Sequence, residues 1–136
     1  MLGSDIKVFF EKHPVLRRHF KGVFAADQIR SVQFQNRSFA VVNTDILHGG
    51  AGGFHWYCLA KLDRRLEVFD PLGVSVDTIK HRLGNKPCYF NSSPVQPEES
   101  QLCGYFCCYW VSLKRKVPSR QLFSFFIAGF CPTVQR

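Results

Sequence analysis

The sequence lacks the long hydrophobic runs that a membrane-spanning helix requires. No apolar stretch approaches the roughly 18 residues that identify such a helix. The first residues also lack a basic region followed by an uninterrupted apolar stretch and a small-residue cleavage site, so no secretory signal is expected. These absences predict a protein that is neither secreted nor bound within a membrane.

Acidic residues are scarce. The 136 residues include 10 Asp and Glu against 18 Lys and Arg, which gives a formal net charge of +8 with His neutral. A positive field of this size favours polyanionic partners, and nucleic acid first among them. The basic residues are spread along the chain and form no separate tail. A solvated basic surface without a partner is therefore the alternative interpretation.

The six cysteines lack the spacing of a zinc site or a disulfide framework. Cys103, Cys107 and Cys108 have helical spacing, and no second pair of Cys or His completes a metal hook. This usage is typical of a reducing compartment, in which Cys58, Cys107 and Cys108 are expected to behave as small buried hydrophobic residues. We predict no metal site and no cofactor for the chemistry.

Apolar residues are plentiful enough to build one core. They make up 46% of the chain and include 14 Phe, which excludes wholesale disorder. The patterns predict helices over 4–12, 15–22, 76–83, 102–116 and 119–128, and strands over 39–44, 54–62, 66–70 and 87–90. With no repeat and no linker, residues 1–136 are predicted to form a single α+β domain. Its small mixed sheet is flanked by helices, and the helix over 102–116 is buried in the middle.

Four positions follow the logic of one catalytic site. His55 begins a strand after a glycine-rich run, and Asp70 ends the next strand, so an antiparallel hairpin would bring carboxylate and imidazole together. Cys103 opens the long apolar helix, where unsatisfied N–H groups and the helix dipole lower the pKa of a thiol. Gln96 lies on the loop entering that helix, where its amide and the Cys103 N–H could form an oxyanion hole.

Each of these residues also has a structural interpretation. His55 suits a hydrogen-bonded strand histidine, and Asp70 before Pro71 suits a turn residue. Gln96 suits a solvated loop, and Cys103 suits a helix core. Their joint placement favours catalysis, because a thiolate beside an imidazolium is the activated nucleophile of cysteine hydrolases.

Several sequence blocks occur in a meaningful order. They are AVVNT at 40–44, GGFHW at 52–56, VFDPLG at 68–73 and PVQPEESQLCGYFCCYW at 94–110. This order resembles the adenain family of adenovirus-type cysteine proteases, which shows a GG-x-HW block, an F-[ED]-P-x-G block, and a Gln seven residues before a C-G-x-F-C-C helix start. The resemblance spans roughly residues 20–128 of this chain. It implies the fold shared by adenain and the ubiquitin-like-protein proteases, with the catalytic Cys at the N-terminus of a buried helix.

The resemblance implies a role for each site residue. Cys103 would be the nucleophile, His55 the general base and then acid, and Asp70 the group that orients His55. Gln96 and the Cys103 amide would form the oxyanion hole. The implied substrate-binding residues are Trp56, which would wall the site beside the His, and Gly53.

The resemblance also implies substrates, partners and a location. The family cleaves viral capsid and core precursors at Gly-containing sites during virion maturation, in the host nucleus and the virion. Some members are stimulated by viral DNA and by a capsid-derived peptide held through a disulfide. In sequence position, Cys88 lies near the place of the family's peptide-holding cysteine, although its distance to Gln96 differs from the adenovirus pattern. The alternative interpretation of Cys88 is a half-buried strand cysteine. We expect a monomer.

Two further functions stay open. The family's orienting carboxylate is often Glu, whereas Asp70 is closer to the SUMO- and ubiquitin-like-protein proteases and favours a deubiquitinase or deSUMOylase as the alternative. The shorter side chain also raises the question whether Asp70 reaches His55. The positive charge, and a chain shorter than the adenovirus members of the family, favour an alternative from another class: an inactive basic nucleic-acid-binding or scaffold domain.

Overall fold

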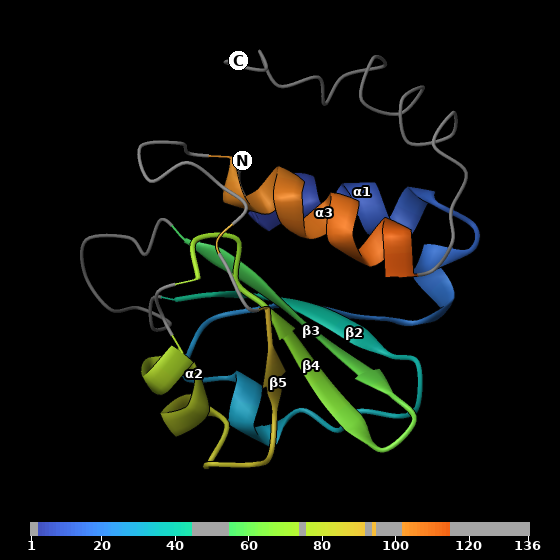
Figure 1. The fold of residues 1–136 in the computed structure, drawn as a ribbon. Helices are drawn as coiled ribbons and strands as arrows, with labels where there is room; N and C mark the ends of the chain where they lie inside the picture. The colour runs from blue at the N-terminus through green and yellow to red at the C-terminus, as the bar shows by residue number, and fades with distance from the viewer. Residues whose placement is uncertain (1–2, 45–54, 74–75, 92–93, 95–101, 115–136) are drawn as a thin grey trace.

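A five-stranded mixed sheet forms the centre of the protein. The computed structural model describes residues 3–44, 55–73, 76–91, 94 and 102–114. The sheet order is β1-β2-β3-β4-β5 (Figure 1). The strands are β1 (Phe20–Phe24), β2 (Phe39–Asn43), β3 (Trp56–Leu62), β4 (Arg65–Phe69) and β5 (Tyr89–Phe90). The two outer pairs, β1–β2 and β4–β5, are parallel, and the inner pairs are antiparallel.

Helices cover both faces of this sheet. The α-helices α1 (Gly3–Lys12) and α3 (Cys103–Lys114) lie side by side on one face (Figure 1). The helix α2 (Val76–Arg82) and the 3-10 turn η2 (Ile29–Ser31) cover the other. The α+β class and the mixed sheet flanked by helices, both predicted from the sequence, are thereby confirmed.

Two apolar cores lie on opposite faces of the sheet, because successive strand residues point to opposite sides. Phe39 and Val41 of β2 belong to the core under α1 and α3, whereas Ala40 and Val42 belong to the core under α2. A strand buried on both faces reads as a continuous apolar run instead of an alternating one. This is why the sequence signal of β2 is strong.

The β3–β4 hairpin fixes the placement of His55 and Asp70. Leu62 pairs with Arg65, so the connection has two residues, and its first residue, Asp63, adopts a φ of 56°. Asp residues tolerate this left-handed conformation better than most. The hairpin register therefore brings the residue before β3 and the residue after β4 to the same end of the sheet.

Residues 15–22 depart from the sequence prediction. The prediction of a helix there is wrong, because the chain forms a short 3-10 turn, η1 (Leu16–Arg18), and then β1. The strand pairs with β2 in parallel, with a register shift beside Gly22, whose φ is 136°. Pairing between distant segments overrides local helical spacing here.

The other α-helices and strands in the described ranges begin and end close to their predicted bounds, whereas the 3-10 turn η2 was not predicted. The helix expected over 119–128 lies outside the described residues. Within the described part of the chain, no helix combines the length and apolar character needed to cross a membrane.

Candidate active site

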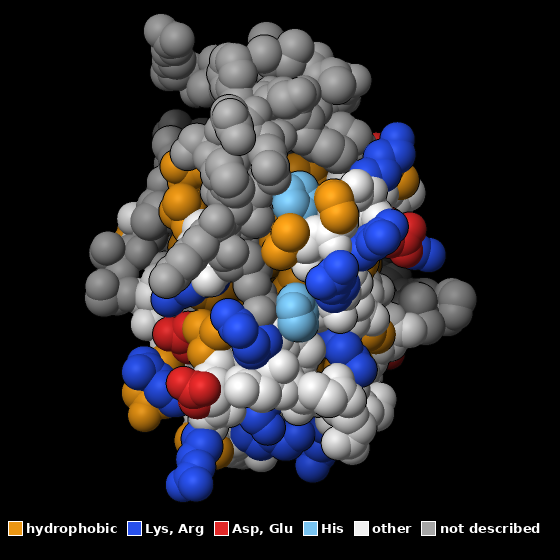
Figure 2. All heavy atoms as spheres, turned by 90° about the vertical axis from the view of Figure 1, so that its right-hand side faces the viewer, with side chains coloured by type: hydrophobic (Ala, Val, Ile, Leu, Met, Phe, Trp, Pro, Cys, Tyr) orange, Lys and Arg blue, Asp and Glu red, His pale blue; other side chains and the backbone are white. Residues whose placement is uncertain are grey.

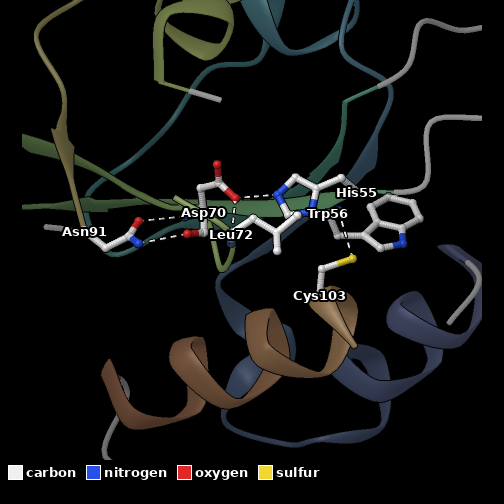
Figure 3. Close-up of polar contacts among 6 residues, drawn as sticks. All are labelled: His55, Trp56, Asp70, Leu72, Asn91 and Cys103. Atoms are coloured by element: carbon white, nitrogen blue, oxygen red, sulfur yellow. Dashed lines mark hydrogen bonds and ion pairs between the residues drawn. The ribbon is translucent and has the colours of Figure 1, made fainter. Parts of the chain in front are cut away.

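His55 and Asp70 meet at the end of the β3–β4 hairpin. His55 immediately precedes β3, Asp70 immediately follows β4, and His55 Nε2 is hydrogen-bonded to Asp70 Oδ1 (Figure 3). The aspartate side chain is fully buried, whereas that of His55 is 14% exposed. The same carboxylate oxygen accepts the Leu72 N–H at 3.1 Å. The shorter Asp side chain therefore does reach the imidazole.

The Cys103 sulfur lies at the head of α3 and faces the start of β3. Cys103 is the first residue of that helix and is only 2% exposed. Its Sγ accepts the backbone N–H of Trp56 at 3.3 Å (Figure 3). His55 lies near enough to Cys103 that each group shifts the pKa of the other. Because His55 Nε2 bonds Asp70, Nδ1 is the ring nitrogen left for the sulfur.

The electrostatics of this trio favour a charge-separated pair. Burial lowers the pKa of the His55 imidazole, but hydrogen bonds to Asp70 and Cys103 and their negative charges outweigh burial and raise that pKa to about 9. Burial raises the pKa of the Cys103 thiol, but the His55 hydrogen bond, the Trp56 and Gly104 N–H groups and the imidazolium charge together lower it. Between the two pKa values the pair consists of thiolate and imidazolium.

The remaining described cysteines differ from Cys103. Cys58, Cys107 and Cys108 are fully buried in the core, and burial raises the pKa of each thiol. Cys88 is half-buried, and its thiol donates a hydrogen bond to the Lys86 carbonyl. Burial raises the pKa of the Cys88 thiol as well, and this outweighs the positive charges of nearby lysines, which lower it. Its role in holding a peptide stays a prediction.

This contrast predicts which thiol reacts first. At pH 7 iodoacetamide should alkylate Cys103 before the more exposed Cys88. The ratio of the two alkylation rates should be about threefold for each unit by which the Cys103 pKa lies below the Cys88 pKa. The gain is less than tenfold because the larger thiolate fraction is partly offset by lower intrinsic nucleophilicity. Peptide mapping by mass spectrometry after short exposures measures both rates in one sample. Labelling of Cys88 ahead of Cys103 would contradict a lowered Cys103 pKa.

Asn91 is a site residue that the sequence analysis did not single out. Its side-chain Oδ1 accepts the Asp70 backbone N–H at 2.9 Å, and its Nδ2 donates to the Asp70 carbonyl at 2.8 Å (Figure 3). The available sequence signal was an Asn directly after a strand, where a side-chain amide can replace a backbone peptide. That signal is weak by itself, since such residues are common in turns.

Two predicted site residues, Gln96 and Gly53, lie outside the described residues. Trp56 is described: it is partly buried, packs against the core under α1 and α3, and donates its N–H to Cys103. In the described ranges, no group of three or more His, Cys, Asp or Glu side chains is arranged to hold a metal ion.

Comparisons with known proteins add no family assignment. No family model matches the chain, and the search of curated proteins finds no match. The function is therefore inferred from the geometry of Cys103, His55 and Asp70 together with the sequence blocks around them.

Proposed function

We propose that the chain is a cysteine endopeptidase of the adenain type. One observation carries the proposal: His55 bonds Asp70, and the Cys103 sulfur lies beside them on the Trp56 N–H, in the order that a nucleophile, a base and an orienting group require. The lowered pKa of Cys103 and the raised pKa of His55 support it. Perturbed pKa values of this kind cluster at functional sites.

The chemistry follows from the two charged partners. The Cys103 thiolate attacks a peptide carbonyl and forms a tetrahedral oxyanion, which the Cys103 N–H and the Gln96 amide would stabilise. His55 Nδ1 donates its proton to the leaving amine as the C–N bond breaks and the acyl-enzyme forms. His55 then takes a proton from water, whose oxygen attacks the thioester and releases the acid. Asp70 holds the imidazole in place throughout and does not transfer a proton.

The proposed substrates are capsid or core precursors cut at Gly-containing sites, with viral DNA and an activating peptide as proposed partners in the nucleus and the virion. The sulfur is nearly enclosed, which suits a substrate without a side chain at the cleaved position. Figure 2 shows Lys and Arg side chains spread over one face of the molecule, where Asp and Glu are few. A surface of this charge is compatible with a polyanionic partner.

A peptide assay tests the proposal. Under reducing conditions the protein should cleave a peptide containing a Gly-containing site, and mass spectrometry should place the cut beside Gly. Brief treatment with iodoacetamide at pH 7 should abolish cleavage, because the thiolate is consumed. Absence of cleavage with and without DNA, together with absence of Cys103 labelling, would reject the protease and favour the basic binding or scaffold domain.

A deubiquitinase or deSUMOylase is the second candidate function. The observation that favours it is the identity of the orienting group, an Asp that bonds His55. The same assay distinguishes the two activities when ubiquitin and SUMO fusions are added as substrates. Faster turnover of the fusions than of short Gly-containing peptides would favour the second candidate.

A further inference from the structure

The Asn91 side chain bonds both polar groups of the Asp70 main chain. Its amide accepts the Asp70 N–H at 2.9 Å and donates to the Asp70 carbonyl at 2.8 Å (Figure 3). In the parallel pairing of β4 with β5, Glu67 lies opposite Tyr89 and Val68 opposite Phe90. The Asn91 amide therefore continues the hydrogen-bonded contact of these strands beyond the end of β5, with a side chain in place of a backbone peptide.

The main chain that Asn91 bonds carries the Asp70 carboxylate, so its placement decides whether that carboxylate reaches His55. Asp70 is fully buried and follows the last residue of β4, so its main chain has left the regular ladder. A buried N–H and carbonyl need partners, and a main chain without them would shift toward water or another donor. Since Asp has only one carbon between its Cα and its carboxylate, a main-chain shift would move that carboxylate away from the imidazole.

The turn after Asp70 is fixed from the same side. The Asp70 carbonyl also accepts the Gly73 N–H at 3.0 Å, and Gly73 has a φ of 67°. A Cβ at Gly73 would lie 3.2 Å from the Pro94 backbone nitrogen, so this turn lies close to Pro94. Asn91 thus holds the Asp70 main chain on its β5 side, and the turn that follows has little room to move toward Pro94.

We propose that Asn91 is a positioning residue that aims the Asp70 carboxylate at His55, an inference that rests on the proposed function. Asn91 contacts the main chain of Asp70 and acts through it. Its removal should therefore weaken the His55–Asp70 contact without removing any reacting group.

The expected consequence is electrostatic. Among the residues that the structure describes, the charged groups that act on His55 are Asp70, from the end of β4, and Cys103, from the head of α3. If Asp70 turns away, the pKa of His55 should fall from about 9 toward its ordinary value of 6.5. The pKa of Cys103 should then rise, because its imidazolium partner loses its proton at a lower pH. Less thiolate is present at pH 7.

The experiment compares Asn91→Ala with Asn36→Ala. Asn36 is a matched control, because its side-chain oxygen accepts a backbone N–H, that of Asp63, at 2.7 Å at the opposite end of the same hairpin. Asn91→Ala should lower kcat by roughly tenfold to a hundredfold, the range for loss of an outer-shell orienting partner, with KM nearly unchanged. It should also lower the His55 pKa measured by NMR and slow Cys103 alkylation at pH 7. Asn36→Ala should change none of these, even where it lowers Tm.

A His55 titration and an alkylation profile like those of the wild type in Asn91→Ala would overturn the inference, whatever happens to Tm. If Asn91→Ala does not fold, Asn91→Ser replaces it, since a hydroxyl can keep one of the two bonds. An intermediate His55 pKa would support the inference, and an unchanged one would overturn it. These two readouts need no substrate. Failure of the wild type to cleave peptides would therefore reject the protease while leaving the positioning role tested.

Discussion

Replacing Cys103 with Ala is expected to lower kcat/KM for peptide cleavage by about 10⁴-fold or more, the scale seen when a nucleophile is removed from a catalytic triad. The cause is chemical, because no other described cysteine has both a lowered pKa and a contact with His55. The fold should survive. The lost Trp56 N–H contact to sulfur is worth about 1 kcal/mol of the free energy of unfolding.

Cys108→Ala is the matched control for this variant. Cys108 lies on the same helix and is fully buried in the core, away from His55. Loss of its sulfur should cost about 1 kcal/mol of unfolding free energy through a small cavity and leave cleavage near the wild-type rate. Denaturant unfolding and progress curves on both variants separate the effects. A Cys103→Ala variant that still cleaves would require another nucleophile.

The elements that the sequence predicts well are those whose burial is simple. β2 and β3 are buried on both faces and read as apolar runs. α3 is also apolar nearly all round, but the expectation that it is buried in the middle of the domain is wrong, because it lies on one face of the sheet with Tyr109 and Leu113 exposed. β1 was missed for the opposite reason. Its strand state depends on parallel pairing with β2, a partner about twenty residues away, and on a register shift that local patterns do not encode.

The same distinction holds at the candidate site. His55 and Asp70 are joined by a short hairpin, so their proximity follows from strand pairing alone. The approach of Cys103 to His55 depends on how α3 packs over β3, which no local pattern specifies. The sequence suggested it only through the chemical logic of the four positions and the order of the sequence blocks. The bonds from Asn91 to Asp70 span 21 residues and depend on where β5 ends, so the sequence could not assign them.

Asp70→Asn is expected to lower kcat/KM by about 10² to 10⁴-fold at pH 7 while the protein stays folded. The substitution keeps the shape of the side chain. The amide oxygen can still accept the Leu72 N–H and the His55 Nε2–H, so geometry is kept and charge is lost. Part of the function is retained, because a thiol ionises more readily than a hydroxyl and depends less on the base.

The pH dependence of Asp70→Asn gives the sharper test. Against the effect of burial, Asp70 and Cys103 together raise the pKa of His55 to about 9, so loss of the Asp70 charge lets the imidazolium deprotonate at a lower pH. The pKa of Cys103 then rises, and the thiolate fraction between pH 6 and 8 falls. Above about pH 9 the thiol ionises without help, so alkylation rates of variant and wild type should converge there. A constant ratio of rates at all pH values would contradict this electrostatic role.

Asp63→Asn is the control that separates this local effect from a change in net charge. Asp63 lies exposed in the two-residue turn at the far end of the same hairpin, and Asn tolerates its φ of 56°. The variant removes one negative charge, as Asp70→Asn does, and should leave the alkylation profile of Cys103 unchanged. If both variants shift that profile equally, overall charge and not the buried carboxylate sets the pKa of His55. If only Asp70→Asn shifts it, the contact between Asp70 and His55 is what keeps the imidazole protonated beside the thiolate.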